Sequence, residues 1–221
     1  MNRRGFVFDL DGTLVDNMAL HASAFETFLA RHGMPPLGAA GRSRFDGKRN
    51  REIFPDLFGR PLSEDELQRY SGEKEGLYRE LSRGNIRPHR GVLPFLDRLE
   101  ALGLPAAIAT SAPLENVTHS LREIQLESRF AHVVRSDEVA RGKPFPDVFL
   151  EAASRIGVPP GECVAFEDAP LGVTAAKAAG MHVVAVTTSF TPAAFREHGA
   201  VFDDAVADYE EYLSGPGAWL R

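Results

Sequence analysis

The sequence is poor in cysteine, has no excess of basic residues and contains no long apolar run. Cys163 is the one cysteine among 221 residues, which excludes an intrachain disulfide, and its apolar surroundings predict a small buried side chain. Acidic residues number 31 against 25 basic ones, so the chain lacks the basic face typical of nucleic-acid binding. No apolar run approaches the about 20 residues that span a bilayer, and none near the N-terminus resembles a signal peptide. We therefore expect a cytoplasmic protein with neither nucleic acid nor membrane as its partner.

Short apolar runs are present instead, and they predict buried parallel strands. They are rich in Val, Ile, Phe and Ala and too short for typical helices, as expected for strands covered on both faces. Segments with apolar residues at helical spacing lie between them. This alternation predicts an α/β fold with a doubly wound parallel sheet. The expected strands are 5–10, 104–110, 131–136, 163–168 and 181–188, and the expected helices are 92–102, 114–126, 147–156 and 171–179.

One interval interrupts this alternation. Roughly ninety residues separate the first expected strand from the second, far more than one crossover helix needs. Two helical patterns lie there, at 17–31 and 63–81, and the second begins at the capping-box pattern SEDE. The segment GNIRPHRG at 84–91 is expected to be the returning hinge. We expect a small α-helical cap domain over 17–86, inserted into a core made of 1–16 and 87–221.

Two carboxylates, Asp9 and Asp11, lie at the end of the first expected strand, in FVFDLDGTLVD at 6–16. Asp9 and Asp11 would share a side of the chain, because alternate side chains of a strand point the same way. The carboxyl ends of parallel strands form the ligand crevice, where carboxylates can bind Mg²⁺, act as a nucleophile or act as a general acid and base. Gly12 allows a sharp turn whose amides can hold an anion. The alternative is that both aspartates are only turn and cap residues.

Polar side chains also follow three later strands. Thr110 and Ser111 offer hydroxyls to a phosphate, Lys143 lies in a rigid GKP turn, and Glu167 and Asp168 follow an apolar run. Each has an ordinary alternative: a helix N-cap, a solvated lysine or a pair of surface acids. Taken together they indicate a metal held by carboxylates, a lysine that offsets their charge, and hydroxyls ready for phosphate.

These motifs resemble those of the haloacid dehalogenase superfamily, in order and spacing. They are DLDGTLVD at 9–16, TS at 110–111, GKPFPD at 142–147 and FEDAPLG at 166–172. The resemblance covers nearly the whole chain and implies a Rossmann-like core with a helical cap. Dehalogenases of the superfamily lack the second acid, so the aspartate at position 11 implies a phosphatase or a phosphomutase.

The resemblance also implies roles for individual residues. Asp9 would be the nucleophile that forms an aspartyl phosphate, and Asp11 would be the general acid and base. Thr110 would bind a phosphoryl oxygen, and Lys143 would link the nucleophile to the transferring group. Mg²⁺, the implied cofactor, would be bound by Asp9, the backbone carbonyl of Asp11, Asp168 and, directly or through water, Glu167.

Within the superfamily, the chain is most similar to the β-phosphoglucomutase-like branch, but it departs from the mutase. The mutase's cap arginine aligns with Asn50, and its serine–lysine pair aligns with Ala112 and Pro113, which offer no side-chain donor. A bisphosphate would therefore lack some of the side-chain contacts that bind its second phosphate in the mutase. We predict hydrolysis of a small phosphomonoester, a sugar phosphate or similar metabolite, with β-phosphoglucomutase activity as the alternative.

Cap residues are expected to contribute to substrate binding. His21 lies where the mutase has a histidine that assists its acid/base, and an ordinary surface histidine is the alternative. The stretch FDGKRNREIF at 45–54 is expected to be a specificity loop with Lys48, Arg49 and Asn50 facing the crevice, unless it is a solvated basic loop. Lys74, in SGEKEG, lies near a cap lysine of the mutase, but it is expected to be a solvated lysine.

Two non-enzymatic functions are the remaining alternatives. A receiver-like phospho-acceptor domain also combines acids, a hydroxyl and a lysine, but it is about half this length and has no cap. A catalytically silent binding module on this fold is the other alternative, although no motif residue is missing. We expect a monomer whose partner is a small phosphorylated metabolite.

Overall fold

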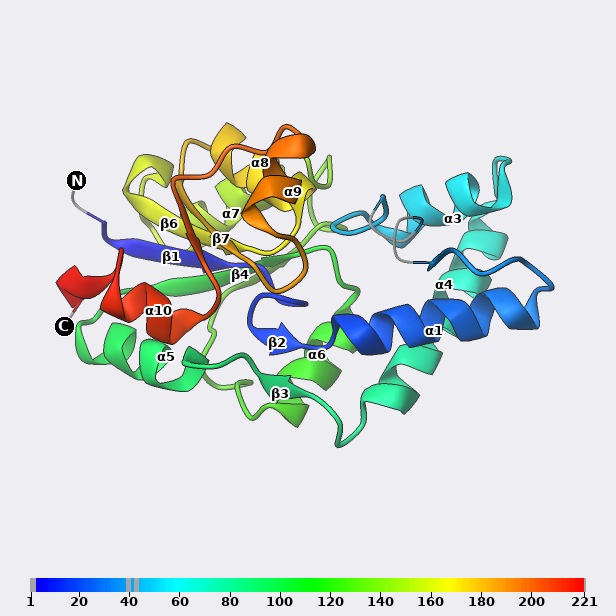
Figure 1. The fold of residues 1–221 in the computed structure, drawn as a ribbon, viewed down its shortest axis with the longest axis horizontal. Coiled ribbons are helices and arrows are strands. Elements are labelled where there is room, and N and C mark those ends of the chain that lie inside the picture. Colours follow the sequence, from blue (N-terminus) through cyan, green and yellow to red (C-terminus); the bar gives the residue numbers. More distant parts are fainter. Residues whose placement is uncertain (1–2, 39–40, 42–43, 221) are drawn as a thin grey trace.

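The computed structural model of the protein describes residues 3–38, 41 and 44–220. Its centre is a parallel sheet with the strand order β5-β4-β1-β6-β7-β8 (Figure 1). The chain leaves β1 toward β4 and β5 and later returns toward β6, β7 and β8, so the doubly wound α/β fold is confirmed. The strands are β1 (Gly5–Phe8), β4 (Ala106–Thr110), β5 (Val133–Arg135), β6 (Cys163–Glu167), β7 (His182–Val186) and β8 (Asp204–Val206).

Helices cover both faces of the sheet (Figure 1). Phe6 and Phe8 of β1 pack on the face covered by α5, α6 and α10, whereas Val7 packs on the face covered by α7, α8 and α9. This alternation follows from the two-residue period of a strand. The helices are α5 (Val92–Ala101), α6 (Leu114–Glu123), α7 (Asp147–Arg155), α8 (Pro170–Ala178), α9 (Pro192–Glu197) and α10 (Tyr209–Ser214), with short 3₁₀ helices η1 (Pro160–Glu162) and η2 (Ala218–Leu220).

Strand β1 is fixed by burial on both sides. Phe6 and Phe8 are fully buried, and their rings contact Phe95 edge-on at centroid distances of 5.6 and 6.0 Å. Burying one such side chain contributes about 1.5–3 kcal/mol. Because β1 lies between β4 and β6, the residues that follow Phe8 emerge at the middle of the sheet edge.

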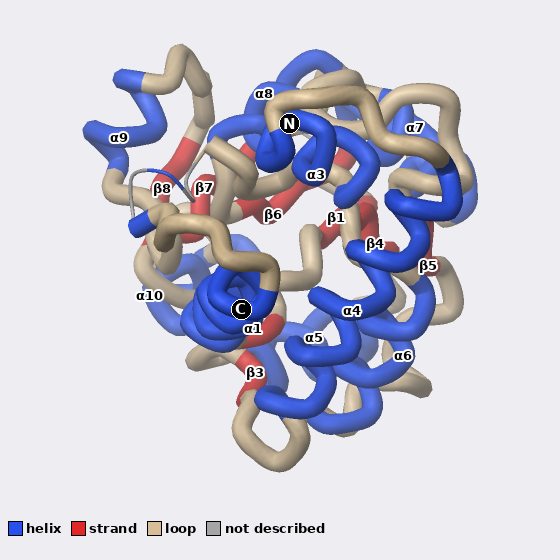
Figure 2. The backbone as a smooth tube through the Cα atoms, turned by 90° about the vertical axis from the view of Figure 1, so that its right-hand side faces the viewer, coloured by secondary structure: helices blue, strands red, loops and turns tan. Residues whose placement is uncertain are grey.

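A separate group of helices lies beside one end of the sheet. Helices α1 (Met18–Arg31), α3 (Asn50–Phe58) and α4 (Glu64–Ser82) share an apolar core, and Figure 2 views the molecule from their side. Ser63 caps α4 through the expected capping box with Glu66. The chain passes between the helical group and the sheet along β2 (Val15–Asp16) and β3 (Arg87–Pro88), which pair antiparallel. The core of the group is Ala24, Phe28, Phe54, Tyr70, Leu77 and Tyr78.

Three parts of the fold differ from the sequence-based expectation or extend it. The stretch 45–54 is not a loop throughout, because helix α3 begins at Asn50 and carries Pro55 inside it, a residue that argues against a helix. Strand β8 and helices α9 and α10 were not predicted. The C-terminal segment packs on the core, since the Trp219 ring stacks on Phe6 at 6.3 Å and Leu220 is buried. In the described part of the chain, no helix is long and apolar enough to span a membrane.

Candidate active site

The first motif lies at the carboxyl end of β1, where a cavity opens between the sheet and the helical group. Asp9 and Asp11 both line this cavity, whose open space, including its mouth, is about 700 Å³. Gly12 turns the chain with a φ of 81°, and a Cβ atom there would lie 2.1 Å from Oδ2 of Asp168. The turn after Asp11 therefore requires glycine.

Lys143 joins two of the predicted acids. Its Nζ atom donates to Oδ1 of Asp9 at 2.6 Å and to Oε1 of Glu167 at 2.7 Å, and all three side chains are buried. Burial and the neighbouring Glu167 raise the pKa of Asp9 to about 8, although Lys143 opposes them. Burial lowers the pKa of Lys143, but the two carboxylates outweigh it and the pKa is raised overall. Lys143 therefore stays charged beside the predicted nucleophile.

Asp168 lies next to this pair and adds a third buried carboxylate. Thr13 donates to its Oδ1 at 3.1 Å, and the Ser189 hydroxyl donates to its Oδ2. Burial, Glu167 and Asp9 raise the pKa of Asp168 well above its usual range. Among the described residues, Lys143 is the cation that contacts Asp9 and Glu167, and no cation contacts Asp168, so the three carboxylates are short of positive charge.

That shortage is the chemistry a divalent cation would correct. Mg²⁺ prefers one or two carboxylates together with water and phosphate oxygens. Asp9 and Asp168 offer two carboxylates, while the Glu167 carboxylate is engaged by Lys143 and by the Ala169 amide, which donates to Oε2 at 2.7 Å. Among the described residues, no group of three or more acidic, histidine or cysteine side chains is arranged to hold a metal by itself. The donor set fits Mg²⁺ completed by water and phosphate.

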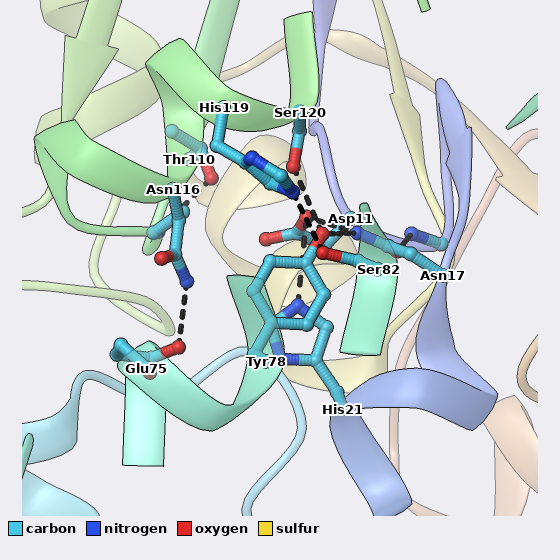
Figure 3. Close-up of polar contacts among 12 residues, drawn as sticks. Asp11, Asn17, His21, Glu75, Tyr78, Ser82, Thr110, Asn116, His119 and Ser120 are labelled. Carbon is cyan, nitrogen blue, oxygen red and sulfur yellow. Dashed lines mark hydrogen bonds and ion pairs between the residues drawn. The ribbon is translucent and has the colours of Figure 1, made fainter. Parts of the chain in front are cut away.

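Asp11 is oriented by residues of the helical group (Figure 3). The Asn17 amide donates to Oδ1 of Asp11 at 2.6 Å, and Nε2 of His21 lies 3.7 Å from the same oxygen. The His21 ring stacks on Tyr78 with centroids 3.8 Å apart. Burial raises the pKa of Asp11, but His21 and Asn17 outweigh it and the pKa lies below its ordinary value. His21 was a candidate from the sequence, whereas Asn17 was not.

The two hydroxyls after β4 have different partners. Thr110 is buried, and its Oγ1 accepts a hydrogen bond from the Ala112 amide at 3.1 Å. The Ser111 hydroxyl donates to the Gly47 carbonyl at 2.8 Å and so links the sheet to the loop before α3. Both residues line the cavity. The Ser111 hydroxyl hydrogen is used in the hydrogen bond to Gly47. The Thr110 hydroxyl donates to no described residue, so it can donate a hydrogen bond to a ligand oxygen.

The three candidates in the stretch 45–54 do not lie together. Lys48 and Asn50 line the cavity, but Arg49 does not. The Arg49 guanidinium pairs with Oε1 of Glu52 at 2.6 Å and donates to the Ser136 carbonyl at 3.3 Å. Arg49 therefore ties the start of α3 to the core instead of facing the crevice.

The expectation of a solvated Lys74 is wrong. Lys74 is 3% exposed, and its Nζ atom lies 3.0 Å from Oε1 of Glu75 and 3.1 Å from Nδ1 of His21. Lys74, Glu75 and Asn116 all line the cavity, and the last two were not predicted. A signal for Lys74 was present, because Tyr70, Lys74 and Tyr78 recur at a spacing of four on one helix face.

Comparisons with known proteins identify the family to which the chain belongs. Residues 6–186 match the family model of haloacid dehalogenase-like hydrolases. Hexitol phosphatase A of Escherichia coli is 34% identical over 198 residues, 84% of each chain. A phosphorylated carbohydrates phosphatase of Thermotoga maritima is 33% identical over 214 residues, covering 94% of this chain and 95% of its own. The structure of β-phosphoglucomutase from Clostridium difficile superposes with a TM-score of 0.81 over 99% of both chains at 21% identity, a likeness of fold.

Proposed function

The chain belongs to the haloacid dehalogenase-like hydrolases, and on that premise we propose a Mg²⁺-dependent phosphatase that acts on a small phosphomonoester through an aspartyl phosphate on Asp9. Its class is that of the phosphoric monoester hydrolases, which its named phosphatase relatives share. The observation that carries the proposal is the buried contact of Lys143 with both Asp9 and Glu167 at the carboxyl end of the sheet.

Asp9 is the proposed nucleophile. One of its carboxylate oxygens attacks phosphorus, and the bond between phosphorus and the ester oxygen breaks. Lys143 offsets negative charge on Asp9 and on the phosphoryl oxygens, and the Thr110 hydroxyl donates to one of those oxygens. Phosphoryl transfer depends mostly on such positioning and charge stabilisation, which supports these roles.

Asp11 is the proposed general acid and base. Because its pKa is lowered, Asp11 is ionised in the free protein, so we propose that it takes a proton from the monoanion of the phosphomonoester and gives it to the leaving oxygen. It then takes a proton from the water that attacks the aspartyl phosphate, so that Asp9 and inorganic phosphate are released. Asn17 and His21 hold the Asp11 carboxyl group in place for both steps. One group can serve both steps because the second is the reverse of the first in proton flow.

The proposed cofactor is Mg²⁺, which would be bound by Asp9, Asp168 and the backbone carbonyl of Asp11. Glu167 would bind it through a water molecule. When bound, Mg²⁺ supplies positive charge that favours the ionised form of Asp9 and draws the phosphate toward it. The crowding of Asp9 and Asp168 supports this assignment, because burial and the neighbouring carboxylates raise the pKa of each, and a divalent cation would favour their ionised forms.

The proposed substrate is a sugar phosphate or a similar metabolite. Support comes from the named relatives, a hexitol phosphatase and a phosphorylated carbohydrates phosphatase. We also propose that residues 17–86 form a cap that covers the substrate. Their helices have an apolar core of their own and join the sheet through the β2–β3 pair.

Phosphomutase activity is the second candidate, because the β-phosphoglucomutase fold superposes over almost the whole chain. Ala112 and Pro113 argue for hydrolysis, since both line the cavity and neither side chain donates a hydrogen bond. A bisphosphate intermediate must be held at both ends while it turns over, and this wall offers the second phosphate no donor.

The test is phosphate release from a panel of sugar and polyol monophosphates, with and without Mg²⁺. We expect Mg²⁺-dependent release that the Asp9→Asn variant loses. β-Glucose 1-phosphate is followed with and without glucose 1,6-bisphosphate, and glucose 6-phosphate is measured beside free phosphate. Faster formation of glucose 6-phosphate than of phosphate identifies a mutase, and full activity of Asp9→Asn overturns the mechanism.

A further inference from the structure

A buried carboxylate lies on the cap side of the cavity, held by residues from three helices. Glu75 of α4 is 5% exposed and lines the cavity. Its Oε1 accepts from the Asn50 amide of α3 at 2.8 Å, and its Oε2 accepts from the Asn116 amide of α6 at 2.6 Å. Figure 3 shows the contact between Glu75 and Asn116 across the gap between α4 and α6. We call Asn50, Glu75 and Asn116 the Glu75 wall.

The Glu75 carboxylate of this wall is ionised, and it is paired with the ammonium group of Lys74 at 3.0 Å. Burial raises the pKa of Glu75, but the charges of Lys74 and His21 and the Asn50 amide outweigh it, and the pKa lies below its ordinary value. The carboxylate is therefore ionised at neutral pH. Lys74 does not present a free cation to the cavity, because its Nζ atom is bonded to Glu75 and to His21.

The wall is separated from the reacting end by a short series of side chains. Asp11 lies beside His21, His21 contacts Lys74, and Lys74 contacts Glu75, with distances of 3.7, 3.1 and 3.0 Å. Asp11 is the proposed proton donor to the leaving group, so the leaving group extends from Asp11 into the cavity that Glu75 lines.

We infer that Glu75 determines specificity, accepting hydroxyl donors of a neutral leaving group and repelling a second anionic group on the substrate. This inference rests on the proposed phosphatase function and names its substrate class: polyhydroxylated monophosphates, with bisphosphates and phosphorylated acids excluded. A carboxylate has roughly four acceptor positions, and the described residues occupy three, so one remains for a substrate hydroxyl. A second phosphate would face an ionised carboxylate in a desolvated site, where like charges repel strongly.

Two other cations near the cavity do not reverse this charge. Arg79 donates to Oδ1 of Asn116 at 2.8 Å and lies behind the wall. Lys48 lines the cavity from the loop before α3, over the Phe45 ring at 5.7 Å, and Asp46 of the same loop also lines it. Glu75, and not the loop before α3, therefore excludes substrates with a second anionic group.

The experiment compares fructose 1-phosphate with fructose 1,6-bisphosphate, using wild type, Glu75→Gln and Glu73→Gln. Glutamine keeps the size of the side chain and removes its charge. Glu73 is a matched control, since it is on the same helix and pairs with Arg31 and His32 away from the cavity. p-Nitrophenyl phosphate, which has neither hydroxyls nor a second anionic group, reports the chemical step alone.

We expect the wild type to prefer the monophosphate, and Glu75→Gln to shrink the ratio of the two kcat/KM values by about tenfold or more. Glu73→Gln should leave both the ratio and the rate with p-nitrophenyl phosphate unchanged. In Glu75→Gln that rate measures how far the change also reaches Asp11 through Lys74 and His21, and the ratio of the two fructose esters is independent of it. An unchanged ratio in a folded Glu75→Gln variant overturns the inference, as does a wild type that accepts the bisphosphate equally well. The wild-type comparison decides the matter even if the variant does not fold.

The same measurements distinguish failure of the proposed phosphatase function from failure of the Glu75 assignment. A protein that hydrolyses none of the three esters with Mg²⁺ is not a phosphatase of this kind, whatever Glu75 does. A protein that hydrolyses p-nitrophenyl phosphate and both fructose esters without discrimination remains a phosphatase, and only the assignment of Glu75 falls.

Discussion

Lys143 lies with its Nζ atom 2.6 Å from Oδ1 of Asp9, and both side chains are buried at the carboxyl end of the sheet. The contact holds the predicted nucleophile ready and places a fixed positive charge where a phosphoryl group would arrive. Such fixed charges act strongly in a site that excludes water, because nothing has to reorganise when the reaction begins.

Lys143→Met should therefore lower kcat for phosphate release by about 10²–10³-fold, the usual effect of losing one such group. Initial rates at saturating Mg²⁺ measure the change. Lys177→Met is the control, since Lys177 is also paired with a carboxylate, that of Asp203 at 2.9 Å, but on the surface. Equal losses in the two variants would show that Lys143 acts only through stability.

Asp11→Asn should separate the two chemical steps. With p-nitrophenyl phosphate the leaving group needs little protonation, so Asp9 is still phosphorylated, but no base then activates water. We expect a burst of about one nitrophenolate per enzyme, followed by turnover slowed about 10²–10⁴-fold. Rapid-mixing absorbance measures the burst. A uniformly slow reaction without a burst would contradict the role of Asp11 as the base of the second step.

The sheet and its acidic edge are predictable because two simple signals coincide. Strands β1, β4, β6 and β7 are continuous apolar runs, which indicates burial on both faces. Asp9 directly follows β1, and Thr110 and Glu167 are the last residues of β4 and β6, so parallel topology brings these polar side chains to one edge of the sheet. Strand β8 gives neither signal, since it has three residues and begins with an aspartate.

The cap side of the site is less predictable for a physical reason. The contact between Asn116 and Glu75 joins residues 41 positions apart, and it exists only because α4 packs against α6. No periodicity reports how two helices meet across a cavity. Helix α4 also carries so many charged residues that Lys74 and Glu75 look solvated until the packing of their face is known.

Tyr78→Phe tests the junction between the helical group and the core. The Tyr78 hydroxyl accepts from the Asn17 amide at 2.7 Å and contacts the Ser120 hydroxyl at 2.9 Å, all in buried surroundings. Removing it leaves two buried polar groups without this partner, so the free energy of unfolding should fall by about 1–2 kcal/mol.

Urea denaturation measures this loss, with Tyr70→Phe as the control. Among the described residues, the Tyr70 hydroxyl accepts from Arg69, an exposed residue that water can solvate, so we expect a change within about 0.5 kcal/mol. A loss in Tyr78→Phe that is no larger than the loss in Tyr70→Phe would mean that the buried Tyr78 hydroxyl contributes little to stability.

Lys48→Ala and Arg49→Ala should have different effects on kcat/KM. Lys48 lines the cavity, so its loss should change the ranking of phosphomonoesters by kcat/KM. Arg49 holds α3 to Ser136, so its loss should lower kcat/KM for every substrate by a similar factor. A panel of sugar monophosphates measures both. An unchanged ranking in both variants would remove the loop before α3 from the determinants of specificity.

His89 gives the protein a stability term that depends on pH. It lies directly after β3, where its backbone amide donates to the Leu14 carbonyl at 3.0 Å. Burial lowers the pKa of His89 below the ordinary 6.5, although Asp16 opposes the shift. Its Nε2 atom is buried and has no hydrogen-bond partner among the described residues, so protonation there would bury an unpaired donor.

The sign of the effect follows from proton binding. Near pH 6 the unfolded chain binds more protons at His89 than the folded chain, so stability rises with pH. The contribution of His89 is complete above pH 6.5 and is lost as the pH falls below that value. Between about pH 7.5 and about pH 5.5, urea denaturation should show a steeper loss of stability in wild type than in His89→Asn. His198→Asn, at an exposed histidine on the surface after α9, should keep the wild-type slope. Parallel slopes for wild type and His89→Asn would mean that His89 titrates alike in the folded and unfolded chains.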